Sequence, residues 1–318
     1  MTQTKPSQFH SAEIAVQERL GITEVVARYS KGFIRAEMPE QHRKFFSELP
    51  FAVLGITDHK GYPWPIPMFG QVGFIQSPND TTLRCTALPE LIKILDLEFI
   101  VGNKIGMLGI QLSTRRRNRV NGLIDSIGSN NFSIQIEQSF GNCPKYIQKR
   151  ELTWTENSQS LLSASDEKFT PIIKANAITL IENADTFFIS SRTQSFNEDK
   201  RSGIDASHRG GKPGFVKVEN YTLTFPDFKG NRFFNTLGNI ESDSRVGLFF
   251  PDFLTGNAVF IAGNARVLWD KKAIEGFDGA ERIVEIKIEK SIYLPTILAM
   301  TTELTEFSPA LKDTSIWQ

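Results

Sequence analysis

The chain from Phe51 onward alternates between short apolar runs and polar turns. In the first half the apolar runs occupy residues 51–56, 73–76, 81–85, 105–112 and 131–140, and turn-forming residues stand between them at 58–61, 77–80 and 128–131. In the second half the apolar runs occupy residues 186–191, 214–219, 221–226, 246–253, 258–269 and 281–294. Runs of this kind, bounded by Gly, Pro, Asn and Asp, predict β-strands. Many short strands with closely spaced turns favour small antiparallel barrels.

Helical patterns are few and short. One helix is expected at residues 11–20, where Ser11 can cap the start and Gly21 the end, and another at 40–49, where Pro39 suits the first turn. Short helices are also expected at residues 89–97 and near 233–242. A parallel α/β sheet needs helices between most of its strands, so the pattern disfavours a Rossmann-type fold.

A set of glycines and other residues recurs along the chain at a constant spacing of 141 residues. The first copy is Gly73, Phe74, Gly106, Thr114 and Gly122, and the second is Gly214, Phe215, Gly247, Thr255 and Gly263. Such a repeat predicts two copies of one β-rich domain. A fused pair resembles a homodimer joined in one polypeptide, so a site at the seam can have two unlike halves.

The repeat and the strand pattern give the expected organisation. The fold class is mainly β with short helices, as tandem barrels related by an internal pseudo-twofold axis. The expected parts are an N-terminal helical segment 1–50, a first barrel 51–154, a connector 155–184 that ends in a helix, and a second barrel with a C-terminal extension 185–318. Each barrel is expected to be of a six-stranded type.

Composition narrows the class of protein. Lysine plus arginine and aspartate plus glutamate number 36 each, so no global field favours nucleic acid or an anionic membrane. Cys85 and Cys143 lack the spacing of a disulfide framework or a zinc site, which suits a reducing compartment. The N-terminal residues are polar and no apolar run approaches a membrane span. We expect a soluble cytoplasmic protein.

Several common catalytic motifs are missing from the sequence. No GxGxxG follows a predicted strand, and the glycines at 210–211 do not complete a phosphate-loop motif. The four histidines are scattered, which argues against a metal site. Asp205, Ser207 and His208 are almost adjacent, whereas a hydrolase triad is normally assembled from distant segments.

Two glycine-containing basic segments in the second copy are candidates for binding an anion. The first, residues 207–215, combines hydroxyl, imidazole, guanidinium and ammonium groups with unhindered backbone. The second, residues 226–239, runs from a strand end into a helix start, where free amides and Arg232 can bind a phosphate. The alternative is a pair of solvated basic loops.

An arginine cluster distinguishes the first copy from the second. Arg115, Arg116, Arg117 and Arg119 lie in residues 114–122, whereas the corresponding residues 255–263 contain no arginine. Arginines within a predicted strand are costly to bury unless they meet anions, so one face of this strand can point into a ligand groove. The alternative is an exposed edge strand protected by charge.

The segment 214–253 resembles the pyridoxamine 5'-phosphate oxidase-like, flavin-binding split-barrel superfamily, in particular its branch with two barrels in one chain. The resemblance extends from about Phe33 to Trp269 and implies one FMN held in the groove between the barrels. It implies that Asp227, Asn231 and Arg232 hold the phosphate and ribityl chain, and that His208, Arg209, Phe215 and Lys217 lie near the ring or phosphate. Further cofactor-binding candidates are Ser190, Ser191 and Ser207 on the same barrel and Arg116, Arg117, Asn118, Lys145 and Tyr146 on the opposite barrel.

The resemblance implies a class of function and leaves the catalytic residues unassigned. True pyridoxamine 5'-phosphate oxidases carry a C-terminal arginine–leucine pair, which this chain lacks. We therefore expect an FMN-dependent oxidoreductase with an undefined small substrate or electron donor, and no nucleic-acid, membrane or metal partner. The alternative is a flavin-binding or electron-relay module without catalysis of its own. The chain is expected to be a monomer or a homodimer.

Overall fold

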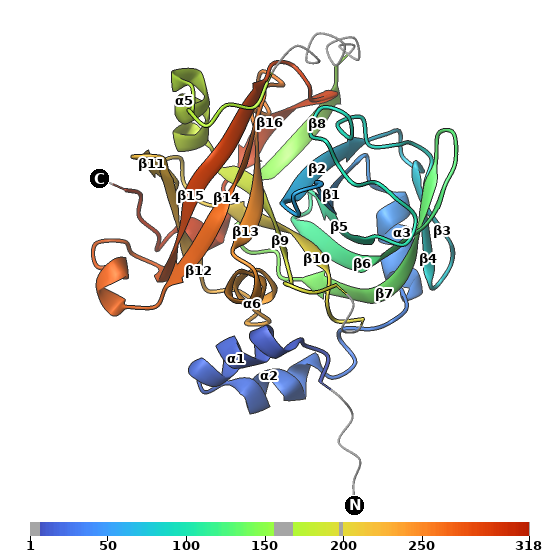
Figure 1. The fold of residues 1–318 in the computed structure, drawn as a ribbon, viewed down its shortest axis with the longest axis horizontal. Coiled ribbons are helices and arrows are strands. Elements are labelled where there is room, and N and C mark those ends of the chain that lie inside the picture. The colour runs from blue at the N-terminus through green and yellow to red at the C-terminus, as the bar shows by residue number, and fades with distance from the viewer. Residues whose placement is uncertain (1–6, 156–167, 197–199, 318) are drawn as a thin grey trace, which may run out of the picture.

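The computed structural model describes residues 7–155, 168–196 and 200–317, and in this part of the chain two large antiparallel sheets dominate (Figure 1). The first sheet, here called the first barrel, contains β1 (Phe51–Thr57), β2 (Pro63–Phe69), β3 (Ile75–Asn79), β4 (Thr82–Cys85), β5 (Lys104–Gln111), β6 (Arg116–Ile127) and β7 (Phe132–Asn142). The second barrel contains β9 (Thr186–Arg192), β10 (Ile204–Gly210), β11 (Lys217–Glu219), β12 (Thr222–Phe228), β13 (Arg245–Pro251), β14 (Ala258–Leu268) and β15 (Ala280–Leu294).

The two barrels have the same topology. The strand order is β2-β1-β5-β6-β7-β4-β3 in the first and β10-β9-β13-β14-β15-β12-β11 in the second, so each strand has a counterpart in the same place. Each sheet has seven strands, one more than expected. The predicted fold class, a mainly β chain of two repeated barrels, is confirmed.

Shorter elements surround the barrels (Figure 1). They are the helices α1 (Ser11–Arg19), α2 (Thr23–Ser30), α3 (Glu40–Ser47), α5 (Ala175–Asn183) and α6 (Asn235–Ser242), the 3₁₀ turns η1 (Lys271–Ile274) and η2 (Pro309–Leu311), and a two-stranded sheet of β8 (Lys149–Trp154) and β16 (Met300–Glu306). The helices α1 and α2 lie below α6 in the view of Figure 1. Among the described residues, no helix has the length and apolar character to cross a membrane.

Glycine is favoured at the repeated positions for the same structural reasons in both barrels. Gly73 and Gly214 have φ values of 94° and 90°, a backbone region that favours glycine. Gly122 and Gly263 lie at register shifts of β6 and β14, where a Cβ atom would overlap a carbonyl of the neighbouring strand. The repeated glycines therefore mark positions where either a positive φ value or a close neighbouring backbone disfavours a side chain.

Gly106 and Gly247 mark the seam between the barrels. A Cβ atom on Gly106 would overlap the carbonyl of Ile204 on β10, and one on Gly247 would overlap the carbonyl of Pro63 on β2. We expect Gly247→Ala to destabilise the protein by about 1–3 kcal/mol, because the added methyl must push the two backbones apart. Urea unfolding measures the change. Gly203→Ala, where only the Lys104 side chain lies near, is the control and should change stability by under about 0.5 kcal/mol.

The apolar core is continuous across the seam. Phe188 of β9 packs edge-on against Phe51 of β1, with ring centroids 5.8 Å apart. Phe188, Phe249 and Phe260 of the second barrel belong to the same buried cluster as the core of the first barrel. The barrels are therefore joined by apolar packing as well as by the chain.

Four sequence-based expectations differ from the structure. Residues 89–97 form turns and no helix, although Leu95 N–H donates to the Leu91 carbonyl. Strand β2 was not expected from the sequence; its three prolines fit because β2 is an edge strand with a free side. The start of segment 207–215 is not a loop, because residues 207–210 complete the edge strand β10.

The fourth difference is at the N-terminus. The helix α2 was not expected from the sequence, and His10 rather than Ser11 is the N-cap of α1, with Glu13 completing a capping box. Pro39 is the N-cap of α3 and not a first-turn residue. The helices α3, α5 and α6 lie within the predicted segments.

Candidate functional site

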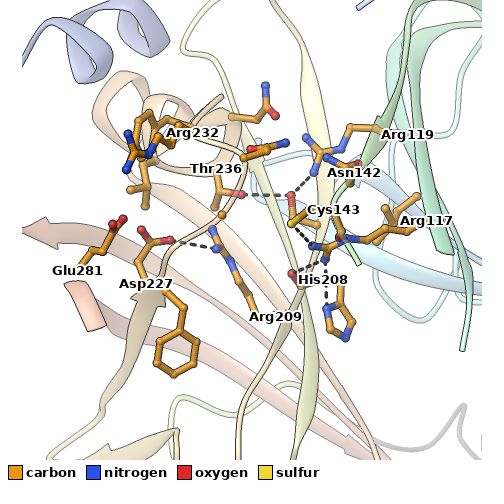
Figure 2. A pocket seen from close by; sticks show the side chains of 18 of the residues that line it. Arg117, Arg119, Asn142, Cys143, His208, Arg209, Asp227, Arg232, Thr236 and Glu281 are labelled. Carbon is orange, nitrogen blue, oxygen red and sulfur yellow. Dashed lines mark hydrogen bonds and ion pairs between the residues drawn. The ribbon is translucent and has the colours of Figure 1, made fainter. Parts of the chain in front are cut away.

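A pocket lies between the two barrels (Figure 2). The first barrel contributes Leu108, Arg117, Arg119, Asn142 and Cys143. The second barrel contributes Ser207, His208 and Arg209 of β10, Asp227 and Phe228 of β12, Glu281 and Arg282 of β15, and residues of the segment 230–237.

Strand alternation decides which of the clustered arginines reach the pocket. Arg117 and Arg119 are two residues apart on β6, so their side chains leave the same face of the sheet, and both line the pocket. Arg116 points elsewhere, with its guanidinium 4.6 Å from the Phe45 ring centroid. Because β6 pairs with β5 on one side and β7 on the other, the edge-strand interpretation of the cluster is wrong.

Arg119 is a buried cation with a buried counter-charge. Its Nη1 donates to Asp205 Oδ1 at 3.1 Å and its Nη2 donates to Ser207 Oγ. Asp205 also accepts from Asn121 at 2.7 Å and from Asn239 at 2.8 Å. The carboxylate of Asp205 thus accepts three side-chain hydrogen bonds, and it holds Arg119 at the back of the pocket.

Arg117 lies in the same wall without a carboxylate partner among the described residues. Its Nε donates to the Cys143 carbonyl at 2.9 Å, and its Nη1 lies 3.3 Å from His208 Nδ1. Burial lowers the pKa of Arg117, since removal from water penalises the charged form. The cations Arg119 and Arg209 lie near enough to lower this pKa further, so the desolvated guanidinium is an electrostatic cost that an anionic ligand can offset.

His208 is neutral at physiological pH. Its side chain is buried, with the ring against Phe188, and burial together with Arg117 and Arg209 lowers its pKa well below the ordinary value of 6.5. Its Nε2 atom has no hydrogen-bond partner within the described ranges. Because a guanidinium can only donate, Nδ1 accepts from Arg117 and Nε2 carries the proton of the neutral imidazole. Nε2 can therefore donate to a ligand, but the ring does not supply a positive charge.

Arginines hold both carboxylates of the pocket wall. Asp227 accepts from Arg209 at 3.0 Å and from Arg282 at 2.8 Å, and Glu281 accepts from Arg282 at 2.6 Å. Asp227 therefore orients two guanidinium groups beside the pocket. Arg282 was not among the predicted residues, because its proximity depends on the pairing of β12 with β15, where Asp227 stands opposite Arg282.

The start of α6 forms the other end of the pocket. Asn231 Oδ1 accepts from the Phe233 amide at 3.2 Å, and Arg232 and Phe234 have φ values of 63° and 64°. The helix then begins at Asn235, and its first-turn residues line the pocket. Amides in the first turn of a helix have no partner inside the helix, and Arg232 forms no ion pair within the described part of the chain. This end can bind an anion.

Seven of the predicted site residues line this pocket: Arg117, Ser207, His208, Arg209, Asp227, Asn231 and Arg232. Among the pocket-lining residues that were not selected as site candidates from the sequence are Arg119, Asn142, Cys143, Glu281 and Arg282. Arg119 could have been found from its two-residue spacing to Arg117, because alternate residues share a strand face.

The other predicted residues lie outside the pocket lining. Phe215 is a core residue, 5.8 Å from the Phe187 ring, and Lys217 pairs with Glu219 at 3.1 Å on the outer strand β11. Both residues lie away from the pocket because β10 ends at Gly210. The chain after β10 then turns away from the pocket before it reaches Phe215 and Lys217.

The remaining candidates surround the site at a greater distance. Ser190 and Ser191 are buried in β9, where Ser191 accepts from Asn239 at 3.1 Å. Asn118 is buried on β6, and Lys145 is exposed. Tyr146 stacks on Phe228, a wall residue, and donates to the Lys229 carbonyl at 3.3 Å. Tyr146 thereby supports the wall without lining it.

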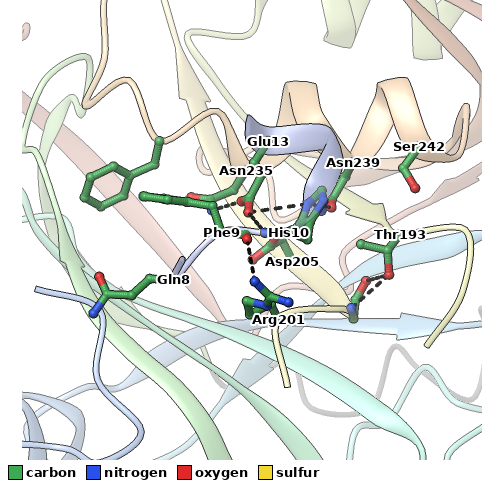
Figure 3. A network of polar contacts seen from close by, with 12 residues as sticks. Gln8, Phe9, His10, Glu13, Thr193, Arg201, Asp205, Asn235, Asn239 and Ser242 are labelled. Atoms are coloured by element: carbon green, nitrogen blue, oxygen red, sulfur yellow. Dashed lines mark hydrogen bonds and ion pairs between the residues drawn. The ribbon is translucent and has the colours of Figure 1, made fainter. Parts of the chain in front are cut away.

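A buried polar chain runs from the pocket wall to α1 (Figure 3). Asn239 of α6 donates to Asp205, and its Oδ1 lies 3.0 Å from His10 Nε2. Glu13 of α1 accepts from the His10 amide at 2.9 Å and from the Asn235 side chain. Burial raises the pKa of Glu13 to about 6.

The raised pKa of Glu13 predicts a pH dependence of stability. Between about pH 4.5 and 6 the folded chain retains a proton that the unfolded chain has released, so this contribution to stability falls as pH rises, by about 2 kcal/mol in total. Glu13→Gln removes the titrating group, so the variant does not lose this contribution. The difference in unfolding free energy between variant and parent should therefore shift by about 2 kcal/mol in favour of the variant as pH rises from 4.5 to 7, as measured by urea unfolding. The same substitution at exposed Glu24 should give no such gain.

Comparison with known proteins gives matches only among solved structures: no family model matches the chain, and no curated protein does. A candidate pyridoxamine 5'-phosphate oxidase from Lactobacillus delbrueckii is 16% identical with a TM-score of 0.31, over 39% of this chain and 97% of that chain. An FMN-binding protein from Syntrophomonas wolfei is 9% identical with a TM-score of 0.27, over 38% and 84%. An FAD-binding protein from Mycobacterium smegmatis is 14% identical with a TM-score of 0.25, over 38% and 96%.

Proposed function

We propose that this chain is a flavoprotein that binds FMN in the pocket between its barrels and acts as an oxidoreductase on a small substrate. The observation that carries the proposal is the pairing of two features: a helix start with Arg232 at one end of the pocket, and at the other a desolvated Arg117 that has no carboxylate partner among the described residues. Both features can bind an anion, and a flavin nucleotide carries a phosphate and, when reduced, a negative charge on its ring.

The pocket residues fit such a cofactor. The first-turn amides of α6 and the guanidinium of Arg232 would hold the phosphate, in the way that helix starts bind anions. Arg117 and the unpartnered Nε2 of His208 would face polar atoms of the ring. Phe228 and Leu108 supply apolar wall. Asp227 acts indirectly, by fixing the orientation of Arg209 and Arg282.

One cofactor per chain follows from the asymmetry of the barrels. The 141-residue offset places Ala258 and Phe260 of β14 where β6 has Arg117 and Arg119. Phe260 is buried and stacks on Phe249 with ring centroids 4.9 Å apart. The residues that correspond to α6 at the same offset, 94–101, contain no helix. The symmetry-related place is therefore filled by apolar side chains.

A bound flavin supplies hydride or electron transfer at its ring, and the protein supplies binding, orientation and electrostatics. Arg117 would favour an anionic reduced ring, because a buried guanidinium stabilises a nearby negative charge. His208 would contribute a hydrogen bond without competing charge, since its low pKa keeps the imidazole neutral. Leu108 and Phe228 would exclude water from that face.

Reconstitution of the purified full chain tests the proposal. We expect a yellow protein with one FMN per chain, and weaker binding of riboflavin, which lacks the phosphate. Fluorescence titration with FMN, FAD and riboflavin measures the three affinities. A protein that remains colourless and binds none of these flavins at micromolar concentration would overturn the proposal.

A second candidate function is an electron-relay module that depends on a partner for turnover. It is favoured by the commitment of both wall carboxylates to arginines and by the low pKa of His208, because ion-paired carboxylates and a weakly basic imidazole are poor groups for proton transfer. Anaerobic mixing of the FMN-loaded protein with NADH or NADPH separates the two. Rapid bleaching supports the oxidoreductase, and persistent yellow colour supports the relay.

A further inference from the structure

The N-terminal strap, defined as residues 7–30 with α1 and α2, lies against the segment that forms the phosphate end of the pocket. Tyr29 Oη donates to the Asn231 carbonyl at 2.5 Å, and the Tyr29 ring stacks on Phe233 at 5.8 Å. Phe9 also packs against Phe233, with ring centroids 5.3 Å apart. The strap thus holds both the backbone before Arg232 and the side chain after it.

The strap also holds the start of α6. Glu13 accepts from the side chain of Asn235, the first residue of that helix. Gly238 lies one turn later, and a Cβ atom there would come within 2.8 Å of the Glu13 backbone. The absence of a side chain at Gly238 therefore allows α1 to lie directly on α6.

The backbone that the strap holds is strained. Arg232 and Phe234 both have left-handed φ values, which non-glycine residues rarely adopt. Such conformations persist where the surroundings over-determine them. The contacts of Tyr29 and Phe9 on either side of Arg232 provide this constraint, although no residue of the strap lines the pocket.

From these contacts we propose that the N-terminal strap is a positioning element for phosphate recognition, and that Tyr29 is its principal positioning residue. The strap fixes residues 231–234 so that Arg232 and the first amides of α6 converge on one phosphate group. This inference rests on the proposed function and deepens it: the strap determines preference for a phosphorylated flavin over an unphosphorylated one. It makes an N-terminal segment outside both barrels a determinant of ligand specificity.

Tyr29→Phe tests this inference, because it removes the hydroxyl and keeps the stacked ring. We expect FMN affinity to fall about three- to tenfold while riboflavin affinity stays within twofold of the parent. The matched control is Tyr221→Phe, on an exposed tyrosine at the turn before β12, which should change neither affinity. Fluorescence titration of the full-length variants with both flavins gives the ratio directly.

Gly238→Ala tests the strap from the opposite side. The methyl group displaces Glu13 and α1, yet alanine is a better helix former than glycine, so α6 itself is not weakened. The same selective loss of FMN affinity is expected.

The outcomes separate the inference from the function on which it rests. If both variants bind FMN and riboflavin as the parent does, or lose both equally, the strap has no specific role at the phosphate and the inference is overturned. If the parent itself binds no flavin, the proposed function fails first. Selective loss of FMN in both variants supports the inference.

Discussion

Asp205→Ala is expected to lower the free energy of unfolding by about 3–5 kcal/mol. Asp205 is buried and accepts hydrogen bonds from Arg119, Asn121 and Asn239. Removing the carboxylate leaves Arg119 as an uncompensated buried cation, and breaking a buried pair from one side has this magnitude of cost. Urea unfolding at pH 7, followed by tryptophan fluorescence, measures it.

The control for Asp205 is exposed Asp80, whose replacement by alanine should change stability by less than about 0.5 kcal/mol. The loss of stability in Asp205→Asn should lie between those of Asp205→Ala and Asp80→Ala, because the amide side chain keeps one acceptor oxygen. A loss of under 1 kcal/mol for Asp205→Ala would show that Arg119 reaches water or another anion when Asp205 is absent, and would contradict the buried network described above.

Arg232→Ala is expected to weaken FMN binding about ten- to a hundredfold. The substitution removes a charge-assisted contact to the phosphate worth about 1.5–3 kcal/mol. Riboflavin affinity should change little, since riboflavin has no phosphate. Arg266→Ala is the matched control, because Arg266 is an exposed arginine on β14 paired with Glu285 and remote from the pocket lining. Titration of the purified apoproteins with both flavins gives the comparison.

An Arg232→Ala variant that purifies fully yellow and binds FMN as tightly as the parent would place the phosphate elsewhere. Arg117→Met then becomes the informative substitution, because Arg117 is the other arginine of the pocket without a carboxylate partner among the described residues. If Arg117→Met weakened the binding of FMN but not of riboflavin, the phosphate would be assigned to the β6 end of the pocket.

Local sequence patterns were sufficient for the repeat and for most of the strands. The glycines at 141-residue spacing are required by the backbone itself, at positive φ values, at bulges and at the seam, so they can be recognised without a structure. Alternating and continuous apolar runs likewise reflect burial of strand faces. The arginine asymmetry between residues 114–122 and 255–263 correctly indicated that the two halves differ.

Other features could not be predicted, because they depend on which strands become neighbours. The prolines of β2 fit only because that strand lies at a sheet edge. Asp227 meets Arg282 only through the register of β12 with β15, 55 residues apart in sequence. Phe215, a glycine-flanked aromatic beside a basic segment, is in the core because β10 ends before it.

The sequence by itself determined the two-barrel architecture and the chemical character of the site, because local turns, strand faces and charge are properties of neighbouring residues. Tertiary structure alone decided which arginines line the pocket and which have buried counter-charges. It also placed Tyr29 and Glu13 against the start of α6, more than 200 residues away along the chain. The physical reason is that a buried charge or a strained backbone is stabilised by whatever packs beside it in space, and the sequence specifies those partners only through the complete fold.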